Sequence, residues 1–177
     1  MTRWEAALDG AAETRAPGRL RWGLSALVIA VDQLAKALVT IGLPLYGSKT
    51  VIPGVVDLVH VQNMGVAFGF LHDLGHPQQV LITTGLALVA LIGIGYYARH
   101  IRADEYLARM GLALILGGAL GNLVDRYRYG YVIDFVDVYW RDWHFWVFNV
   151  ADAAITVGAI LVFVDLLFMN RHASDPV

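Results

Sequence analysis

The 177-residue sequence contains no cysteine, which excludes disulfide bonds, thiolate metal sites and thiol nucleophiles. Charge is also scarce, since only 16% of the residues are Asp, Glu, Lys or Arg and the net charge is -2. The chain therefore has neither the long basic face of a nucleic-acid-binding protein nor an acidic tail. In contrast, 58% of the residues are hydrophobic, which is more than one soluble core would be expected to contain. This composition indicates a polytopic membrane protein.

Motifs of common hydrolases and nucleotide-binding proteins are absent as well. The sequence has no His-Glu-x-x-His zinc-protease helix, no Gly-x-Ser-x-Gly nucleophile turn and no phosphate-binding loop. The nearest metal-like pattern is "HDLGH", with His72 and His76, but its Gly- and Pro-containing surroundings favour an exposed loop over a metal-binding helix. We therefore expect neither a metal ion nor a cofactor.

Four stretches are apolar over about 20 residues, the length that an α-helix needs to cross the hydrocarbon core of a bilayer. They are Trp22 to Leu43, Val80 to Ala98, Leu107 to Val124, and Val147 to Met169. The sequence thus predicts an all-α membrane protein with a single membrane-embedded domain over residues 19–171. Residues 1–18 predict a disordered cytoplasmic tail, and residues 172–177 predict a short cytoplasmic C-terminal tail.

Positive charges are distributed unevenly between the two sides of these spans. Eight lie on one side and four on the other: Arg3, Arg15, Arg19, Arg21, Arg99, Arg102, Arg109 and Arg171 against Lys49, Arg126, Arg128 and Arg141. Because positive charge concentrates on the cytoplasmic side, both termini are predicted to be cytoplasmic and the two long connections to face outward. The first connection, Pro44 to Gln79, has the alternation of short strands or an interfacial segment. The second, Asp125 to Trp146, is rich in the Tyr and Trp of membrane interfaces.

Polar side chains within or beside the spans are the candidates for function, because they are costly in a bilayer. Asp32 and Lys36 lie four residues apart on one helical face, which fits either an internal ion pair or support for a site. Asn63 stands two residues before Gly65, a pattern that fits either a turn or a site residue. Gly118 belongs to a group of glycines that would let a helix or a peptide approach closely.

The second outward connection carries further candidates. Asn122, Asp125 and Arg126 cluster at the outer end of the third span, where they fit either a solvated helix end or a site. Asp134 lies in an apolar, aromatic stretch, in which a carboxylate is costly unless it is paired or hydrogen-bonded.

Asn149 and Asp152 occur three residues apart on one face of the fourth span, at its outward end. The predicted topology therefore brings Asp134, Asp152 and several amide and guanidinium groups to one depth near the outer interface. Two carboxylates in a low-dielectric site do not both ionise easily, so one would keep a proton while the other acts as a base. Such a pair fits an aspartyl hydrolase, and it fits a transport or proton-relay site equally well.

At these residues the sequence resembles the lipoprotein signal peptidases, also called signal peptidase II. The resemblance rests on four blocks in the order of the family: "VDQLAKALV", "QNMGVAFGF", "GGALGNLVDRYRYGYVIDF" and "FNVADAAITVG". It implies four transmembrane helices, a small extracytoplasmic β-cradle and a short interfacial helix. It also implies that Asp134 and Asp152 are the catalytic aspartates. The residues that would bind substrate or support the site are Asn63, Gly118, Asn122, Arg126, Asn149, Asp125, Asp32 and Lys36.

The resemblance also implies the reaction and the location. The expected substrate is a prolipoprotein that carries a diacylglyceryl group on a cysteine, cut on the N-terminal side of that cysteine. The expected enzyme is a monomer in the bacterial inner membrane, in contact with membrane lipids and not with nucleic acid, with its active site near the periplasmic face. The alternatives are a small transporter or proton-relay subunit, and a scaffold that only binds lipidated peptides.

Overall fold

The computed structural model describes residues 20–65, 75–102 and 105–172. It contains four long helices: α2 (Trp22–Gly42), α3 (His76–His100), α4 (Tyr106–Tyr129) and α5 (Val150–His172). Each is long and apolar enough to cross a membrane, so the prediction of four apolar helices of membrane-spanning length is confirmed. The predicted tails lie almost wholly outside the described residues, as do residues 66–74, which include His72 of the metal-like pattern.

The helix boundaries differ from the predicted spans at the polar ends. Helix α3 begins at His76 rather than Val80, and α4 continues to Tyr129, five residues beyond the predicted end. Hydropathy detects only the part of a helix that matches the bilayer core, whereas the hydrogen-bonded helix continues where its polar residues find partners in the protein. Gly130 ends α4 in the left-handed conformation (φ 78°), and its N–H bonds the Arg126 carbonyl at 3.0 Å.

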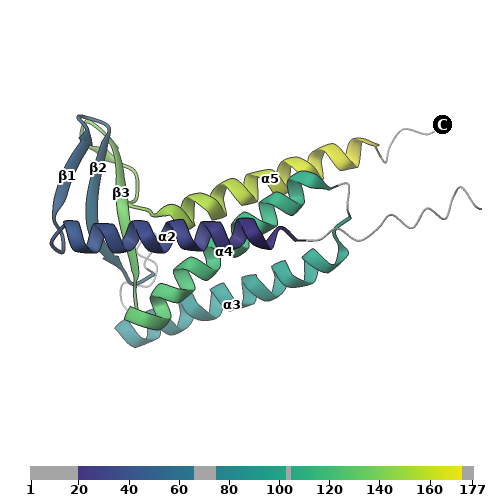
Figure 1. The fold of residues 1–177 in the computed structure, drawn as a ribbon, viewed down its shortest axis with the longest axis horizontal. Helices are drawn as coiled ribbons and strands as arrows, with labels where there is room; N and C mark the ends of the chain where they lie inside the picture. The colour runs from purple at the N-terminus through teal and green to yellow at the C-terminus, as the bar shows by residue number, and fades with distance from the viewer. Residues whose placement is uncertain (1–19, 66–74, 103–104, 173–177) are drawn as a thin grey trace, which may run out of the picture.

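The two long connections form one antiparallel sheet of four strands in the order β1-β2-β3-β4. Strands β1 (Ser48–Ile52) and β2 (Val56–Asn63) come from the first connection, as one of its two interpretations predicted. The second connection, which we expected only to lie at the interface, supplies β3 (Val132–Trp140) and β4 (Trp143–His144). The sheet lies at one end of the helices (Figure 1). The described ranges contain no short interfacial helix.

Helix α4 packs against each of the other three helices, whereas α3, within the described residues, packs against α4 alone. Gly118 is one of the glycines at which α4 packs closely against α5. A Cβ atom there would overlap the Ala151 carbonyl oxygen and come within 2.8 Å of Ile155 Cγ1. Gly118 therefore brings α4 against the first turn of α5, which carries Asp152.

We expect Gly118→Ala to destabilise the protein by about 1–3 kcal/mol, because the backbone of α5 would have to move. The measurement is the thermal midpoint in detergent. Gly93→Ala is the matched control, because a Cβ at Gly93 in α3 meets nothing within 4 Å. This control should be neutral or slightly stabilising, since alanine favours a helix over glycine. Equal midpoints for the two variants would contradict the close packing at Gly118.

The largest fully buried side chains in the interior are mostly polar, although small and medium apolar residues are buried as well. Among the residues that the structure describes, the six largest fully buried side chains are the hydrophobic Ile101 and five polar ones: Lys36, Asn149, Asp32, Asp125 and Asp134. Large apolar side chains along α2, α3 and α5 are exposed, as expected for surfaces that face lipid. The five polar side chains lie near the sheet end of the helices.

Candidate active site

Asp134 lies near the start of β3, which packs against α2 and α4, and it is 2% exposed. Both of its carboxylate oxygens accept amide hydrogen bonds. Asn63 Nδ2 donates to Oδ2 at 2.8 Å, and Asn149 Nδ2 donates to Oδ1 at 2.6 Å. Asn63 Oδ1 also accepts the N–H of Gly65 at 2.8 Å, which fixes the carboxamide with its NH₂ group toward Asp134. The sequence left a turn and a site contact as alternatives for Asn63. Asn63 makes both, since it bonds Gly65 within the turn and Asp134 in the site.

Asn149 and Asp152 form a capping box at the start of α5. Asn149 Oδ1 accepts the N–H of Asp152 at 2.9 Å, and Asp152 Oδ2 accepts the N–H of Asn149 at 3.2 Å. Each side chain thus satisfies a backbone donor that the first turn of a helix leaves free. The prediction that the fourth span begins at Val147 is wrong, because the helix begins at Val150. The polar pair stands at a helix terminus rather than inside an apolar run.

Asn122 of α4 connects the two aspartates. Its Nδ2 donates to Asp152 Oδ1 at 2.8 Å, and its Oδ1 accepts a hydrogen bond from Asn149 Nδ2 at 3.2 Å. Because Asn149 Nδ2 also bonds Asp134, carboxylates from a strand and a helix are joined through two carboxamides. We call Asp134, Asp152, Asn122 and Asn149 the dyad cluster.

A buried ion cluster lies directly beside the dyad cluster. Lys36 Nζ is 2.8 Å from Asp32 Oδ2 and 2.8 Å from Asp125 Oδ2, and all three side chains are at most 2% exposed. Lys36 also donates to Asn122 Oδ1 at 2.9 Å, and Asp32 Oδ1 accepts the N–H of Ala151 at 2.9 Å. Asp32 and Lys36 therefore form an ion pair and also contact the site. A solvated helix end is the wrong interpretation of Asp125, which is 1% exposed.

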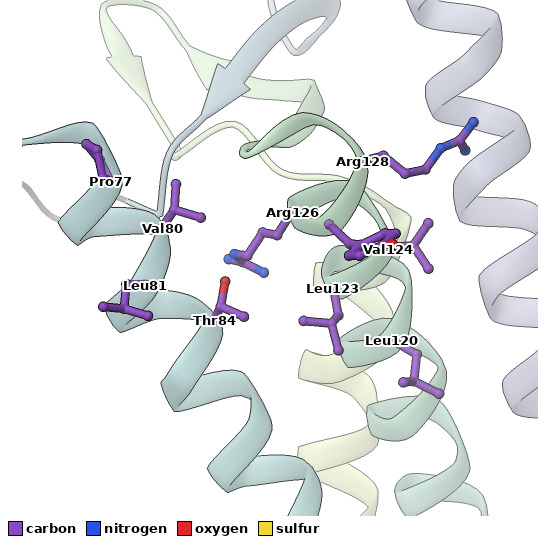
Figure 2. A pocket seen from close by; sticks show the side chains of 10 residues that line it. Pro77, Val80, Leu81, Thr84, Leu120, Leu123, Val124, Arg126 and Arg128 are labelled. Atoms are coloured by element: carbon purple, nitrogen blue, oxygen red, sulfur yellow. The ribbon is translucent and has the colours of Figure 1, made fainter.

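Arg126 extends from α4 beside the dyad cluster. Its Nη1 donates to the Asn122 carbonyl at 3.3 Å, and its charge interacts electrostatically with Asp134 and Asp152. It also lines an apolar groove of about 870 Å³ between α3 and α4, where Figure 2 shows its guanidinium directed toward Thr84. Arg126 thus lies between the carboxylates and a surface that can accept an apolar ligand.

Sequence reasoning missed Gln33. Its Nε2 donates to Asp125 Oδ1 at 2.8 Å and lies 3.3 Å from Asp32 Oδ2, so it belongs to the ion cluster. The available signal was its position next to Asp32 in an otherwise apolar span. Gly118, by contrast, contacts α5 through packing and makes no recorded contact with either catalytic candidate.

Burial raises the pKa of Asp134 from its ordinary 3.8 to about 7. The negative charge of Asp152 adds to this rise, while hydrogen bonds from Asn63 and Asn149 and the charge of Lys36 oppose it. A carboxyl group with such a pKa is about half protonated at neutral pH and mostly protonated below it. It can then act as a general acid while a nearby carboxylate acts as a base.

This pKa predicts a pH dependence of stability. Because the folded-state pKa of Asp134 is above 3.8, its contribution to stability is fully present below 3.8 and is lost as pH rises through about 7. Asp134→Asn cannot titrate and lacks this loss. The difference between the thermal midpoints of the variant and the wild type should therefore move in favour of the variant from pH 5 to pH 8. Parallel curves would contradict the raised pKa.

Together, four membrane-capable helices and a buried pair of amide-bound carboxylates at one end define a membrane protein with an enzyme-like polar site. Comparison with known proteins is more specific. The family model for signal peptidase (SPase) II matches residues 24–168. The lipoprotein signal peptidase of Solibacter usitatus is 43% identical over 159 residues, which cover 88% of this chain and 97% of that protein. That of Nitratidesulfovibrio vulgaris is 45% identical over 149 residues, 82% of this chain and 88% of that protein.

The solved structures agree. A bacterial membrane enzyme determined by the in meso method at 2.3 Å resolution superposes with a TM-score of 0.73 at 26% identity, covering 92% of this chain and 98% of that one. The chain belongs to the signal peptidase II family, as the four sequence blocks predicted.

Proposed function

We propose that this protein is an aspartic endopeptidase that removes the signal peptide from diacylglyceryl-modified prolipoproteins, on the N-terminal side of the lipidated cysteine. The observation that carries the proposal is the pair Asp134 and Asp152, joined through Asn122 and Asn149 in a chain of the signal peptidase II family. The lipoprotein signal peptidases to which the chain is similar support this substrate.

The proposed reaction uses the two carboxyl groups in different protonation states. Asp152, ionised, takes a proton from a water molecule as the water oxygen bonds to the carbonyl carbon of the scissile amide. Asp134, protonated, gives its proton to the carbonyl oxygen, and a tetrahedral diol forms. The proton on Asp152 then passes to the amide nitrogen, the C–N bond breaks, and one diol hydroxyl returns its proton to Asp134. Arg126 and Asn63 are placed to orient the peptide and to stabilise charge on the reacting carbonyl.

We further propose that the sheet end of the helices faces the periplasm and that both termini are in the cytoplasm of a bacterial inner membrane. At that depth the acyl chains of the substrate can stay in the bilayer while the scissile amide meets water. The proposed partners are lipid-modified prolipoproteins and membrane lipids. The enzyme is proposed to work as a monomer.

The distribution of buried polar groups favours a peptidase over a proton relay. A relay requires polar groups that continue through the membrane. Among the described residues, the buried polar side chains toward the end opposite the sheet are Ser25, Glu105 and Asp165, and Asp165 lies 13 residues beyond Asp152 along α5, about 20 Å away. The one on α2 is Ser25. Its hydroxyl donates to the Ala113 carbonyl at 2.8 Å and is thereby engaged in joining α2 to α4.

The test is cleavage of a purified prolipoprotein with and without the diacylglyceryl group, followed by mass spectrometry of both products. The proposal expects one cut, before the lipidated cysteine, and much slower cleavage of the unmodified precursor. Failure to cut the lipidated substrate, or a cut elsewhere, would overturn it. Equal cleavage of both precursors would overturn the assigned substrate class and keep the peptidase activity.

A further inference from the structure

The ammonium group of Lys36 bonds three acceptors that come from two helices. Asp32 Oδ2 and Asp125 Oδ2 are each 2.8 Å away, and Asn122 Oδ1 is 2.9 Å away. An ammonium has three N–H donors and no acceptor, so all three donors are used. Two of these bonds pair Lys36 with the aspartates of the ion cluster. The third bond, to Asn122, connects Lys36 to the dyad cluster.

That third bond determines how the carboxamide of Asn122 is turned. Since Lys36 can only donate, the atom that faces it must be the oxygen of the carboxamide. The NH₂ group then faces the other way, where Nδ2 donates to Asp152 Oδ1 at 2.8 Å. The reverse orientation would place an NH₂ group against the ammonium and an oxygen against a carboxylate, and both contacts would be repulsive.

Asn149 reinforces the same orientation. Its Nδ2 donates to Asn122 Oδ1 at 3.2 Å and to Asp134 Oδ1 at 2.6 Å. The oxygen of Asn122 is therefore an acceptor for two donors, and a change in its orientation would affect contacts with both carboxylates. Lys36 is thus two hydrogen bonds away from Asp152 without touching it.

We propose that Lys36 is a positioning residue of the dyad, because its ammonium holds the Asn122 carboxamide with the NH₂ group toward Asp152. This inference rests on the proposed function. The proposed role distinguishes Lys36 from Gln33. Gln33 contacts the same ion cluster through Asp125 and Asp32, and within the described residues it forms no hydrogen bond with Asn122.

The positive charge of Lys36 also affects the dyad. It favours ionised carboxylates nearby and opposes the rise in the pKa of Asp134. The titratable and charged groups that face Lys36 come from every element around it. They are Asp32 on its own helix, Asp125, Arg128 and Tyr129 on α4, Asp134 on β3 and Asp152 on α5. Removing the cation therefore leaves mainly carboxylates around the site and should make them hold protons more tightly.

The experiment measures kcat, KM and the pH profile of prolipoprotein cleavage for the wild type, Lys36→Met and Gln33→Met, with the thermal midpoint of each. For Lys36→Met we expect kcat to fall about 10²-fold, as for a misplaced catalytic group, with little change in KM. The pH profile should move to higher pH. Gln33→Met should lower the thermal midpoint and keep the wild-type pH profile.

A second variant, Lys36→Met with Asp125→Asn, keeps the net charge of the ion cluster unchanged. It can replace the single variant if that variant does not fold. It also separates the effect of the Lys36 charge from the effect of the hydrogen bond that orients Asn122. Positioning through Asn122 predicts that kcat stays low in this double variant although the pH profile returns toward that of the wild type. Wild-type kcat in a folded Lys36 variant would overturn the proposal, as would a Lys36→Met enzyme that differs from wild type only in its thermal midpoint.

Infrared titration of the protonated Asp134 carboxyl band, identified by its loss in Asp134→Asn, provides a readout that does not depend on substrate. Its midpoint should be higher in Lys36→Met than in the wild type. An unchanged midpoint would contradict the electrostatic effect of Lys36 on Asp134, whereas kcat in the double variant tests the orientation of Asn122. If the wild type fails to cleave prolipoprotein, the proposed function fails and this inference falls with it. If the wild type cleaves and only the Lys36 expectations fail, the proposed function stands.

Discussion

Replacing Asp152 by asparagine is expected to lower kcat by about 10²-fold to 10⁴-fold, the range associated with loss of a general base. An amide cannot take a proton from the attacking water. Asp134→Asn should have a comparable effect, because the variant has no proton to give to the carbonyl oxygen. Both variants should fold, since asparagine has nearly the same shape and loses about one accepted hydrogen bond, which costs about 1 kcal/mol. The measurement is single-turnover cleavage of the lipidated substrate together with the thermal midpoint.

The matched control is Asp57→Asn. Asp57 lies on β2 of the same sheet, and its Oδ1 accepts a hydrogen bond from the Tyr139 hydroxyl at 3.4 Å, away from the dyad cluster. A change of charge on the sheet is thereby tested without a change in the proposed dyad, and near-normal cleavage is expected. If either dyad variant folds and keeps near-normal activity, that aspartate is structural and the proposed mechanism is wrong.

The four spans and the convergence of polar residues could both be predicted from the sequence, because the spans depend on a local pattern and the convergence depends on the order of the spans. Hydropathy over about 20 residues detects α2, α3, α4 and α5 regardless of their partners. The convergence then follows from topology, since the connection that precedes the fourth span must lead Asp134 to the end of that span that carries Asp152. The family resemblance of the four sequence blocks was not needed for either step, although it indicated the substrate class.

The contacts that turn this convergence into a site were not accessible in the same way. Strand β3 is apolar and aromatic, so its sequence fits a membrane interface as well as a strand. Its pairing with β2, which places Val61 opposite Asp134, is a non-local contact. Asp125 resembles a solvated helix end because its partner Lys36 is 89 residues earlier in the chain, and no local pattern connects them.

Asn149 shows how one residue can satisfy both a local rule and a distant one. As the cap of α5 it follows the capping-box pattern, Asn-x-x-Asp, which is visible in the sequence. As a donor to Asp134 it depends on β3 arriving at that helix end. Hydropathy obscured the first role by including Asn149 in the apolar span, so the helix start was placed at Val147.

These two roles predict different results for two substitutions. Asn149→Ser keeps a side-chain oxygen that can cap α5, but it loses the carboxamide bonds to Asp134 and Asn122. Asn149→Ala loses both. We expect kcat to fall about 10²-fold in either variant, because Asp134 loses a donor and the carboxamide link from Asp134 to Asn122 is broken. The alanine variant should in addition be less stable than the serine variant by about 1 kcal/mol, the usual contribution of an N-cap.

The pH profiles provide the internal check. The hydrogen bond from Asn149 lowers the pKa of Asp134, so its loss should raise that pKa further. The high-pH limb of the rate profile should therefore move to higher pH in both variants. The cap does not touch Asp134, so serine and alanine should share this shift although their thermal midpoints differ. If instead the serine variant keeps wild-type kcat and a wild-type profile, Asn149 acts on the reaction only by starting α5. The orientation of the dyad would then have to come from Asn63 and Asn122 alone.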